Sequence, residues 1–182
     1  SITVKTTTGE EVPVTGGTWD NNIATFIMPG ADVTVTPSFT NNITNASVKM
    51  PKTGTTTIEI PATMSLLKIY DDGGEGGSEV EGDQPGNYSN KCDGYLVLKA
   101  PEGYAIQLTG NIITEKEYDY LTVYVGTTYE GTVLLDQKWG DFVYDEQLEC
   151  DKAVPTSIGT LVASSMMLYF HSDAVASYAG LD

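Results

Sequence analysis

The segment YDYLTVYVG (118–126) alternates apolar and polar residues with a period of two. Side chains two positions apart in an extended strand lie on the same face, which groups Leu121, Val123 and Val125 on one face. The opposite face then carries Tyr120, Thr122 and Tyr124. The aliphatic face is typical of a buried core, and tyrosines on the other face are typical of cross-strand ring packing. This segment is therefore predicted to be a strand with one face buried.

The same alternation recurs along the chain in short segments separated by turn-forming residues. In SMMLYFHSD (165–173), Met166, Leu168 and Phe170 share one face. The other strand-like segments are residues 2–5, 11–14, 23–28, 32–39, 55–62, 65–72, 95–101, 104–112, 131–137 and 158–164. Because no window of helical period runs past two turns, the pattern predicts an all-β fold, specifically an antiparallel β-sandwich.

The polar run NNITNAS (41–47) has no periodicity and is interpreted as a linker. It divides the chain into a small β unit, residues 1–44, and a larger β-sandwich, residues 45–182. Two acidic stretches, residues 73–87 and 138–155, interrupt the strands of the larger unit. Both are long enough to be flexible or functional loops.

The net charge of the chain limits the classes of partner that it is expected to bind. Of the 182 residues, 9 are basic and 25 acidic, for a net charge of −16. Such a surface repels phosphate backbones and anionic lipid, which disfavours nucleic-acid and membrane-surface binding. It suits an exported protein that meets cations or neutral polymers. No apolar run approaches the ~20 residues needed to span a bilayer, and the chain opens directly on the strand-like ITVK, as a piece of a longer protein would.

The two cysteines, Cys92 and Cys150, leave two possibilities open, one disulfide or two separate thiols. A disulfide would close a loop of roughly 58 residues and add about 4 kcal/mol of stability in the chain-entropy model.

Several motifs in the larger unit, taken in order, resemble a CUB domain of the kind found in bacterial surface proteins. They are GNYSN (86–90), CDGYLVLKAPEGYAIQLTG (92–110), YDYLTVYVG (118–126) and LYFHSDAVASYAGL (168–181). The resemblance covers roughly residues 48–182. It implies a jelly-roll β-sandwich of about ten strands, extracellular and used for binding and adhesion. The smaller unit, with FIMPGADVTVTPSF (26–39), resembles the end of small β repeats in secreted bacterial multidomain proteins.

The resemblance also implies a calcium site whose ligands would be Glu115, Asp119 and Asp173, with Tyr88 bracing these acids. Two carboxylates about 5 Å apart repel by roughly 3 kcal/mol at an effective dielectric constant of 20, so such a cluster needs a proton or a cation. Calcium takes six to eight oxygens, and backbone carbonyls of residues 174–177 and water would complete the shell. The alternative is an ordinary solvated acidic surface in a chain with 25 acids.

Other acids are not assigned to this site. Glu117 is expected to point outward. Asp71 and Asp72 are interpreted as a hairpin turn, because they lack the spacing of an EF-hand loop.

The chain also departs from the family pattern. Cys92 occupies the second cysteine position of the four-cysteine members and Cys150 lies near the fourth, and neither has its expected partner. A bridge between them would need the 138–155 segment to swing round. The chain stops at residues 180–182, where the final strand should begin, so either that strand is lost or the preceding segments close the sheet.

These observations together predict a non-catalytic binding or adhesion module, with loops ordered by calcium, in a larger secreted or surface-anchored bacterial protein. Its partner would be an extracellular protein or glycan, and the resemblance implies that a basic side chain of a protein partner would contact Glu115 and Asp119. The only histidine, His171, is expected to face solvent or to pack. Its neighbours Ser172 and Asp173 cannot form a triad with it, because adjacent strand residues point to opposite faces.

Two further functions remain open. The first is carbohydrate binding by Trp139, Phe142 and Tyr144, large apolar groups in an acidic loop. The same side chains would otherwise tuck over the sandwich as a lid. The second is a structural spacer in a multidomain stalk, which the small N-terminal repeat favours.

Overall fold

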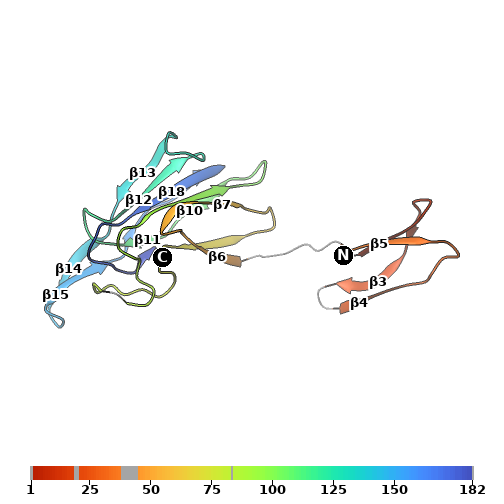
Figure 1. Ribbon diagram of the computed structural model, residues 1–182, viewed down its shortest axis with the longest axis horizontal. Coiled ribbons are helices and arrows are strands. Elements are labelled where there is room, and N and C mark those ends of the chain that lie inside the picture. The colour runs from red at the N-terminus through yellow and green to blue at the C-terminus, as the bar shows by residue number, and fades with distance from the viewer. Residues whose placement is uncertain (1, 19–20, 38–44, 83, 182) are drawn as a thin grey trace. The chain divides into compact units, whose positions relative to one another are not determined.

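The computed structural model describes residues 2–18, 21–37, 45–82 and 84–181 (Figure 1). These residues form strands and turns, and they contain no helix. None of them therefore forms a helix long and apolar enough to cross a membrane. The chain divides into two compact units, Ser1–Asn42 and Ile43–Asp182. The expected linker lies partly outside the described residues, and its last three residues, 45–47, belong to a strand.

The smaller unit consists of a three-stranded sheet and a hairpin. The sheet order is β2 (Glu11–Val12), β1 (Ile2–Thr6), β5 (Val33–Pro37), and the hairpin pairs β3 (Val14–Thr18) with β4 (Asn21–Phe26). Both neighbours of β1 are antiparallel to it. Val4 at the centre of β1 is buried, as the period-two pattern requires.

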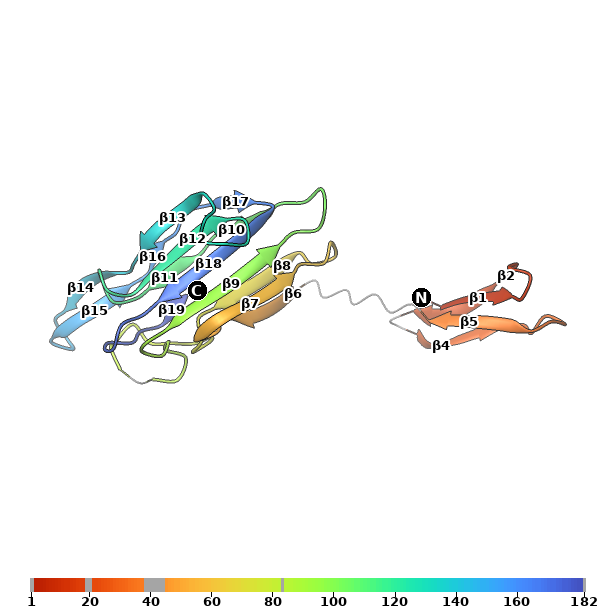
Figure 2. The same ribbon diagram turned by 45° about the horizontal axis from the view of Figure 1, so that its top comes forward.

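The larger unit is built on a five-stranded sheet, seen side by side in Figure 2. Its order is β13 (Val133–Lys138), β12 (Tyr120–Val125), β18 (Ser165–His171), β9 (Asp93–Lys99), β7 (Thr53–Glu59). Leu121 pairs with Phe170, and Val123 with Leu168, so the two apolar faces predicted from the sequence meet on one side of the sheet. All four side chains are buried, and each contributes about 1.5–3 kcal/mol on burial.

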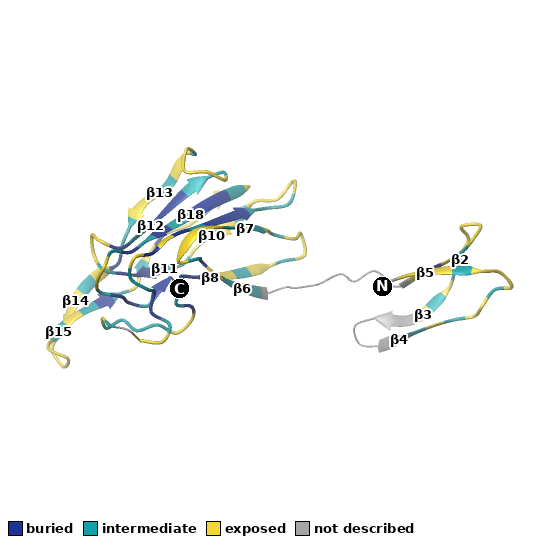
Figure 3. Ribbon diagram, viewed as in Figure 1, coloured by how far each residue is buried: buried dark blue, intermediate teal, exposed yellow. Residues whose placement is uncertain are grey.

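Shorter strands face this sheet across the core. They are β6 (Asn45–Lys49) with β8 (Leu66–Tyr70), β10 (Ile106–Leu108) with β17 (Leu161–Ala163), and β16 (Thr156–Ser157), β11 (Asn111–Ile113), β19 (Gly180–Leu181). Their apolar side chains join one cluster with those of the large sheet. Figure 3 shows the burial concentrated in the middle of β12 and β18. The larger unit is thus all-β, with the layered character of a β-sandwich.

The outer face of the large sheet carries the predicted tyrosine ladder. The rings of Tyr95 and Tyr169 stack with centroids 4.6 Å apart, and Tyr120 meets Tyr169 edge-on at 6.0 Å. His171 extends the ladder, with its ring 5.0 Å from that of Tyr120 and its Nδ1 2.9 Å from Asp93 Oδ1. His171 is therefore a packing residue at the margin of the aromatic face.

The structure corrects several expectations. Two strand pairs are parallel, β6 with β8 and β7 with β9, whereas the sequence pattern predicts a wholly antiparallel arrangement. The 138–155 stretch is not a loop, because it contains the hairpin of β14 (Asp141–Asp145) and β15 (Cys150–Val154). At residues 180–181, where the family pattern places the beginning of the final strand, β19 pairs with β11.

The cysteines do not form a disulfide. Cys150 lies in the β14–β15 hairpin, opposite Asp145, and Cys92 is buried directly before β9. The Cys92 thiol is 2.9 Å from the carbonyl oxygen of Ser89, and burial raises the pKa of this thiol to about 12. Cys92 therefore acts as a small buried side chain.

Candidate metal centre

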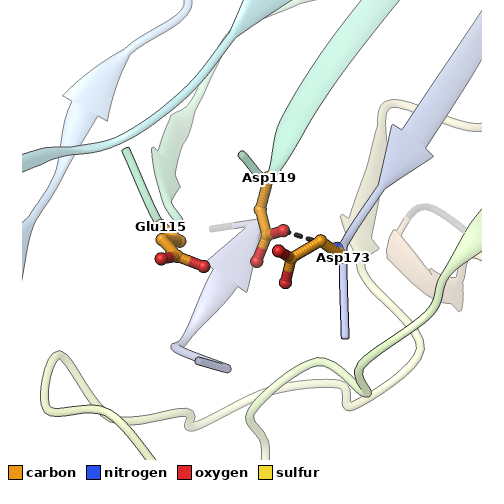
Figure 4. A group of neighbouring side chains, drawn as sticks. All are labelled: Glu115, Asp119 and Asp173. Carbon is orange, nitrogen blue, oxygen red and sulfur yellow. Dashed lines mark hydrogen bonds between the residues drawn. The ribbon is translucent and has the colours of Figure 1, made fainter. Parts of the chain in front are cut away.

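Three carboxylates from two parts of the chain converge at one end of the larger unit. Asp119 directly precedes β12 and Asp173 follows β18, and pairing of Tyr120 with His171 brings these two strand ends together. Glu115 lies in the turn after β11 and reaches the same point. One ligand oxygen from each of the three lies within 4.8 Å of the others. Figure 4 shows Asp119 in the middle of the cluster, with Glu115 on one side of it and Asp173 on the other.

Asp119 is the most constrained of the three. Its side chain is fully buried, and its Oδ1 accepts a hydrogen bond of 2.7 Å from the backbone N–H of Asp173. The Tyr88 hydroxyl donates to Asp119 Oδ2, also at 2.7 Å. The Thr114 hydroxyl donates to the Asp119 carbonyl at 2.8 Å. The carboxylate is thus fixed in one orientation before any ligand arrives.

Tyr88 occupies the bracing position that the sequence resemblance implies. Its hydroxyl accepts a hydrogen bond of 3.1 Å from the backbone N–H of Glu115, and lies 3.2 Å from the carbonyl oxygen of Ala176. Its ring packs edge-on against Phe170 at 5.2 Å. Burial, followed by the charge of Asp119, raises the pKa of Tyr88 far above its ordinary value, so the hydroxyl remains a donor.

The loop after β18 brings backbone oxygen to the cluster. Asp173 Oδ1 accepts a hydrogen bond from the N–H of Val175, which bends the chain back. Ala176 then adopts a left-handed conformation, with φ of +60°, and its carbonyl points at the Tyr88 hydroxyl. One main-chain carbonyl therefore lies beside the carboxylates, within the range 174–177 named from the sequence.

The cluster carries uncompensated negative charge. Desolvation is the largest cause that raises the pKa of Glu115 to about 7, followed by the charges of Asp119, Asp173 and Glu81. Desolvation likewise raises the pKa of Asp119 to about 6. Among the described residues no lysine or arginine pairs with any of the three carboxylates, and Glu115 Oε2 is buried without a hydrogen-bond partner. The arrangement favours a proton or a cation at this point.

Glu81 was not recognised from the sequence. It lies in the 73–87 loop, whose next residue, Gly82, is bonded to Ser177 in both directions: the Gly82 N–H donates to the Ser177 carbonyl and the Ser177 hydroxyl donates to the Gly82 carbonyl. These bonds bring Glu81 close enough for its charge to act on Glu115. The loop has no periodicity, so only its high acidity could have indicated such a role. Glu117, by contrast, is exposed and outside the cluster.

Asp71 has a structural role that the hairpin interpretation missed. Its side chain is fully buried. Oδ1 accepts hydrogen bonds from the N–H groups of Gly73 and Gly74, and Oδ2 accepts one of 2.9 Å from the N–H of Leu181 in β19. Desolvation raises the pKa of Asp71 to about 6. The residue therefore ties the last described strand to the end of β8.

The aromatic residues proposed as a sugar platform differ in exposure. Phe142 is half-buried against the core, with its ring 5.6 Å from that of Tyr178. Trp139 is half-buried, while Tyr144 is 62% exposed. Phe142 thus behaves as the lid considered in the sequence analysis, which leaves Tyr144 as the exposed ring of the three.

The sequence matches no protein-family model, and it matches no curated protein.

Proposed function

We propose that the larger unit is a non-catalytic extracellular binding module of the CUB type, in a larger secreted or surface-anchored bacterial protein, with a calcium ion ordering its loops. The observation that carries the proposal is the convergence of Glu115, Asp119 and Asp173 within 4.8 Å without a basic partner among the described residues. The ordered motifs given in the sequence analysis support the family, and the net charge of −16 supports a cation-binding role.

Calcium fits this donor set better than other common metals. The donors are three carboxylates and the nearby Ala176 carbonyl, all hard oxygens. Zinc prefers histidine and cysteine ligands, and magnesium demands near-ideal octahedral geometry and keeps several waters. Carboxylates, a backbone carbonyl and water can together supply the six to eight oxygens that calcium takes. For a calcium site in an extracellular module, the expected Kd is about 10⁻⁴–10⁻³ M.

The bound ion would couple two segments of the larger unit. Glu115 and Asp119 belong to the turn before β12, and Asp173 and the Ala176 carbonyl belong to the loop after β18, which also contacts residues 82 and 88. A lysine or arginine of a protein partner would then contact the Glu115 carboxylate beside the ion. Such a contact weakens as salt is added, because the Debye length shrinks.

Glu115→Gln is the sharpest test, because the Glu115 carboxylate serves no hydrogen bond that the fold needs. In EDTA the variant is expected to be more stable than the native chain, by about 1 kcal/mol after solvent screening, since a repulsion is removed. In millimolar calcium it is expected to lose most of the rise in melting temperature that the native chain gains. A substitution that stabilises the chain in EDTA but removes most of its stabilisation by calcium would identify Glu115 as a calcium ligand.

Glu117→Gln is the matched control, since it removes the same charge two residues away and outside the cluster. It should keep the calcium-dependent rise. A native chain whose melting temperature does not change between EDTA and 5 mM calcium would refute the calcium site and favour the structural spacer. Salt-sensitive capture of a basic protein, lost in Glu115→Gln and kept in Glu117→Gln, would support the binding role.

A further inference from the structure

A cavity of about 560 Å³ lies beside the loop that follows β8. Its volume falls within the range of small-ligand sites, about 300–1,000 Å³. Three of the residues that line it, Tyr70, Ile113 and Leu181, are buried, whereas Glu75 and Pro155 are exposed. The cavity therefore has a buried floor and a mouth open to solvent. The three carboxylates of the metal centre do not line it.

One wall of the cavity is made of main chain. Gly74, Gly76 and Gly77 line it, and because glycine has no side chain, the atoms that they present belong to the backbone. Among the described residues, neither the N–H groups nor the carbonyl groups of residues 75–77 form a hydrogen bond. The wall thus carries main-chain donors and acceptors that the fold does not use.

The loop is fixed on both sides of residues 75–77. Before them, the buried Asp71 carboxylate accepts hydrogen bonds from the N–H groups of residues 73–74. After them, the N–H of Ser78 donates to the Asn87 side chain at 2.6 Å. The wall is therefore held in place before a ligand arrives, which lowers the entropy cost of binding.

Tyr70 brings a hydroxyl without a partner to the floor of the cavity. Tyr70 is the last residue of β8 and is 7% exposed. Lys68 and Tyr70 share one face of this strand, and Lys68 pairs with Glu75 at the mouth, so the Tyr70 ring lies on the side of β8 that faces the loop. Buried tyrosine hydroxyls usually have a hydrogen-bond partner, yet within the described part of the chain this one has none.

The charges at the cavity are balanced, although the chain as a whole carries −16. Its two carboxylates, Glu75 and Glu79, pair with Lys68 and Lys152 respectively. A cation would have to displace a lysine, and an anion would meet the carboxylates, so an uncharged ligand fits best. Hydroxyl groups both donate and accept hydrogen bonds, which matches the unused main-chain groups and the Tyr70 hydroxyl.

We propose that this cavity binds a neutral saccharide. The Tyr70 hydroxyl and the main chain of residues 75–77 bond to sugar hydroxyls, and the C–H groups of the sugar ring lie against the apolar floor. The site is separate from the hairpin candidates Trp139, Phe142 and Tyr144, none of which lines the cavity. It also contains none of the metal ligands, so saccharide binding should be the same in EDTA and in calcium.

The native chain is first screened on an array of neutral mono- to tetrasaccharides of glucose, galactose, mannose, xylose and N-acetylglucosamine, of which at least one should bind. Titration of that saccharide, followed by NMR, should shift the amide resonances of residues 75–77. Tyr70→Phe should weaken its binding about three- to tenfold, the loss expected for one hydrogen bond. The variant should melt at the same temperature as the native chain, because the hydroxyl has no partner in the fold.

Tyr129→Phe is the matched control, because it removes a hydroxyl from a ring that is 68% exposed and outside the cavity. It should change neither saccharide affinity nor melting temperature. An array on which no saccharide binds, or equal affinity in Tyr70→Phe and the native chain, would overturn the proposal. So would binding that Tyr144→Ala abolishes and Tyr70→Phe keeps, which would place the saccharide on the hairpin. Shifts of residues 75–77 caused by N-acetyl-lysine amide and by no saccharide would identify a cation site instead.

Discussion

The hydroxyl of Tyr88 lies 2.7 Å from Asp119 Oδ2, while the ring of the same tyrosine packs against Phe170 in the core. One side chain thus connects the acid cluster to the interior of the sandwich. Both residues are almost completely buried, Tyr88 at 1% exposure and Asp119 at 0%. Because hydrogen bonds to charged groups contribute more than neutral ones, this contact should matter for both stability and metal binding.

Tyr88→Phe removes the hydroxyl and keeps the ring. It should destabilise the larger unit by about 1–3 kcal/mol, because Asp119 loses a buried donor, and it should weaken calcium binding because Asp119 is less well oriented. Denaturant unfolding with and without calcium measures both effects. Tyr178→Phe is the control, since Tyr178 is also buried but packs against Phe142. Equal losses in the two variants would contradict the bridging role.

Gly180→Ala should be among the most damaging single substitutions. Gly180 has a φ of +77°, and an added Cβ would overlap the Asp71 carboxylate and lie 3.2 Å from the Tyr88 ring. Gly159→Ala is a matched control, because its φ is +75° and nothing lies near its Cβ position. The control should cost about 1 kcal/mol from backbone strain alone, and Gly180→Ala at least about 2 kcal/mol more, from the steric clash. Comparable melting temperatures for the two variants would argue against the packing of β19 on Asp71.

The buried Asp71 carboxyl should make the metal-free unit less stable as pH rises. Its pKa is raised to about 6 from 3.8, so its neutral form is favoured in the fold. Its contribution is therefore fully present below pH 3.8 and is lost as pH rises through 6. The full swing is on the order of 3 kcal/mol for a shift of about two pH units.

Asp71→Asn tests this pH dependence in EDTA. The variant should be less stable than the native chain at pH 5, because it loses the acceptor for the Leu181 N–H. The difference should narrow toward pH 7.5, where the native chain holds a buried charge. A difference that is constant across this range would show that Asp71 does not titrate in it.

Calcium binding should weaken as the solution is acidified. Glu115 and Asp119, with pKa values raised to about 7 and about 6, must lose their protons when the ion binds. The affinity should fall about tenfold or more between pH 7.5 and 5.5, and calorimetry in two buffers should detect released protons. Glu115→Gln should show a flatter dependence. An affinity that is independent of pH would mean that the ion binds elsewhere.

The hairpin β14–β15 offers a test of the aromatic lid. Phe142→Ala should cost about 3 kcal/mol, because Phe142 packs on Tyr178 and the core. Tyr144→Ala should change stability by less than about 0.5 kcal/mol, since its ring is 62% exposed. If Tyr144→Ala instead abolishes retention on insoluble polysaccharide while stability is unchanged, the carbohydrate-binding alternative gains support.

The strands that could be predicted are those in which local pattern and burial agree. In β12 and β18 the side chains that alternate toward the core are buried, so the sequence alone identifies the strand and its inner face. The convergence of Asp119 and Asp173 follows from the pairing of these two strands, which sequence motifs suggested and local periodicity could not. The charge of Glu81 acts on Glu115 because the loop that carries Glu81 is hydrogen-bonded to residue 177. This contact joins segments far apart in the chain, so no local sequence pattern indicates it.

The elements that were missed have pairings that do not depend on local apolar pattern. In β6, residues 45–47 lack a run of large apolar side chains and pair with β8 in parallel, so their backbone bonds rather than their side chains define the strand. In β14 only three residues, 142–144, lie between the charged residues Asp141 and Asp145. This run is too short for an alternating pattern to be recognised. The two residues of β19 are too few for any periodicity, and the Asp71 side chain fixes them in place.

The direction of β6 determines where the acid cluster lies within the larger unit. β6 begins beside Leu66 and ends beside Tyr70, and the residues just beyond Tyr70 contact Ser89, next to the tyrosine that braces the cluster. The polypeptide therefore enters this sandwich at the pole opposite the carboxylates.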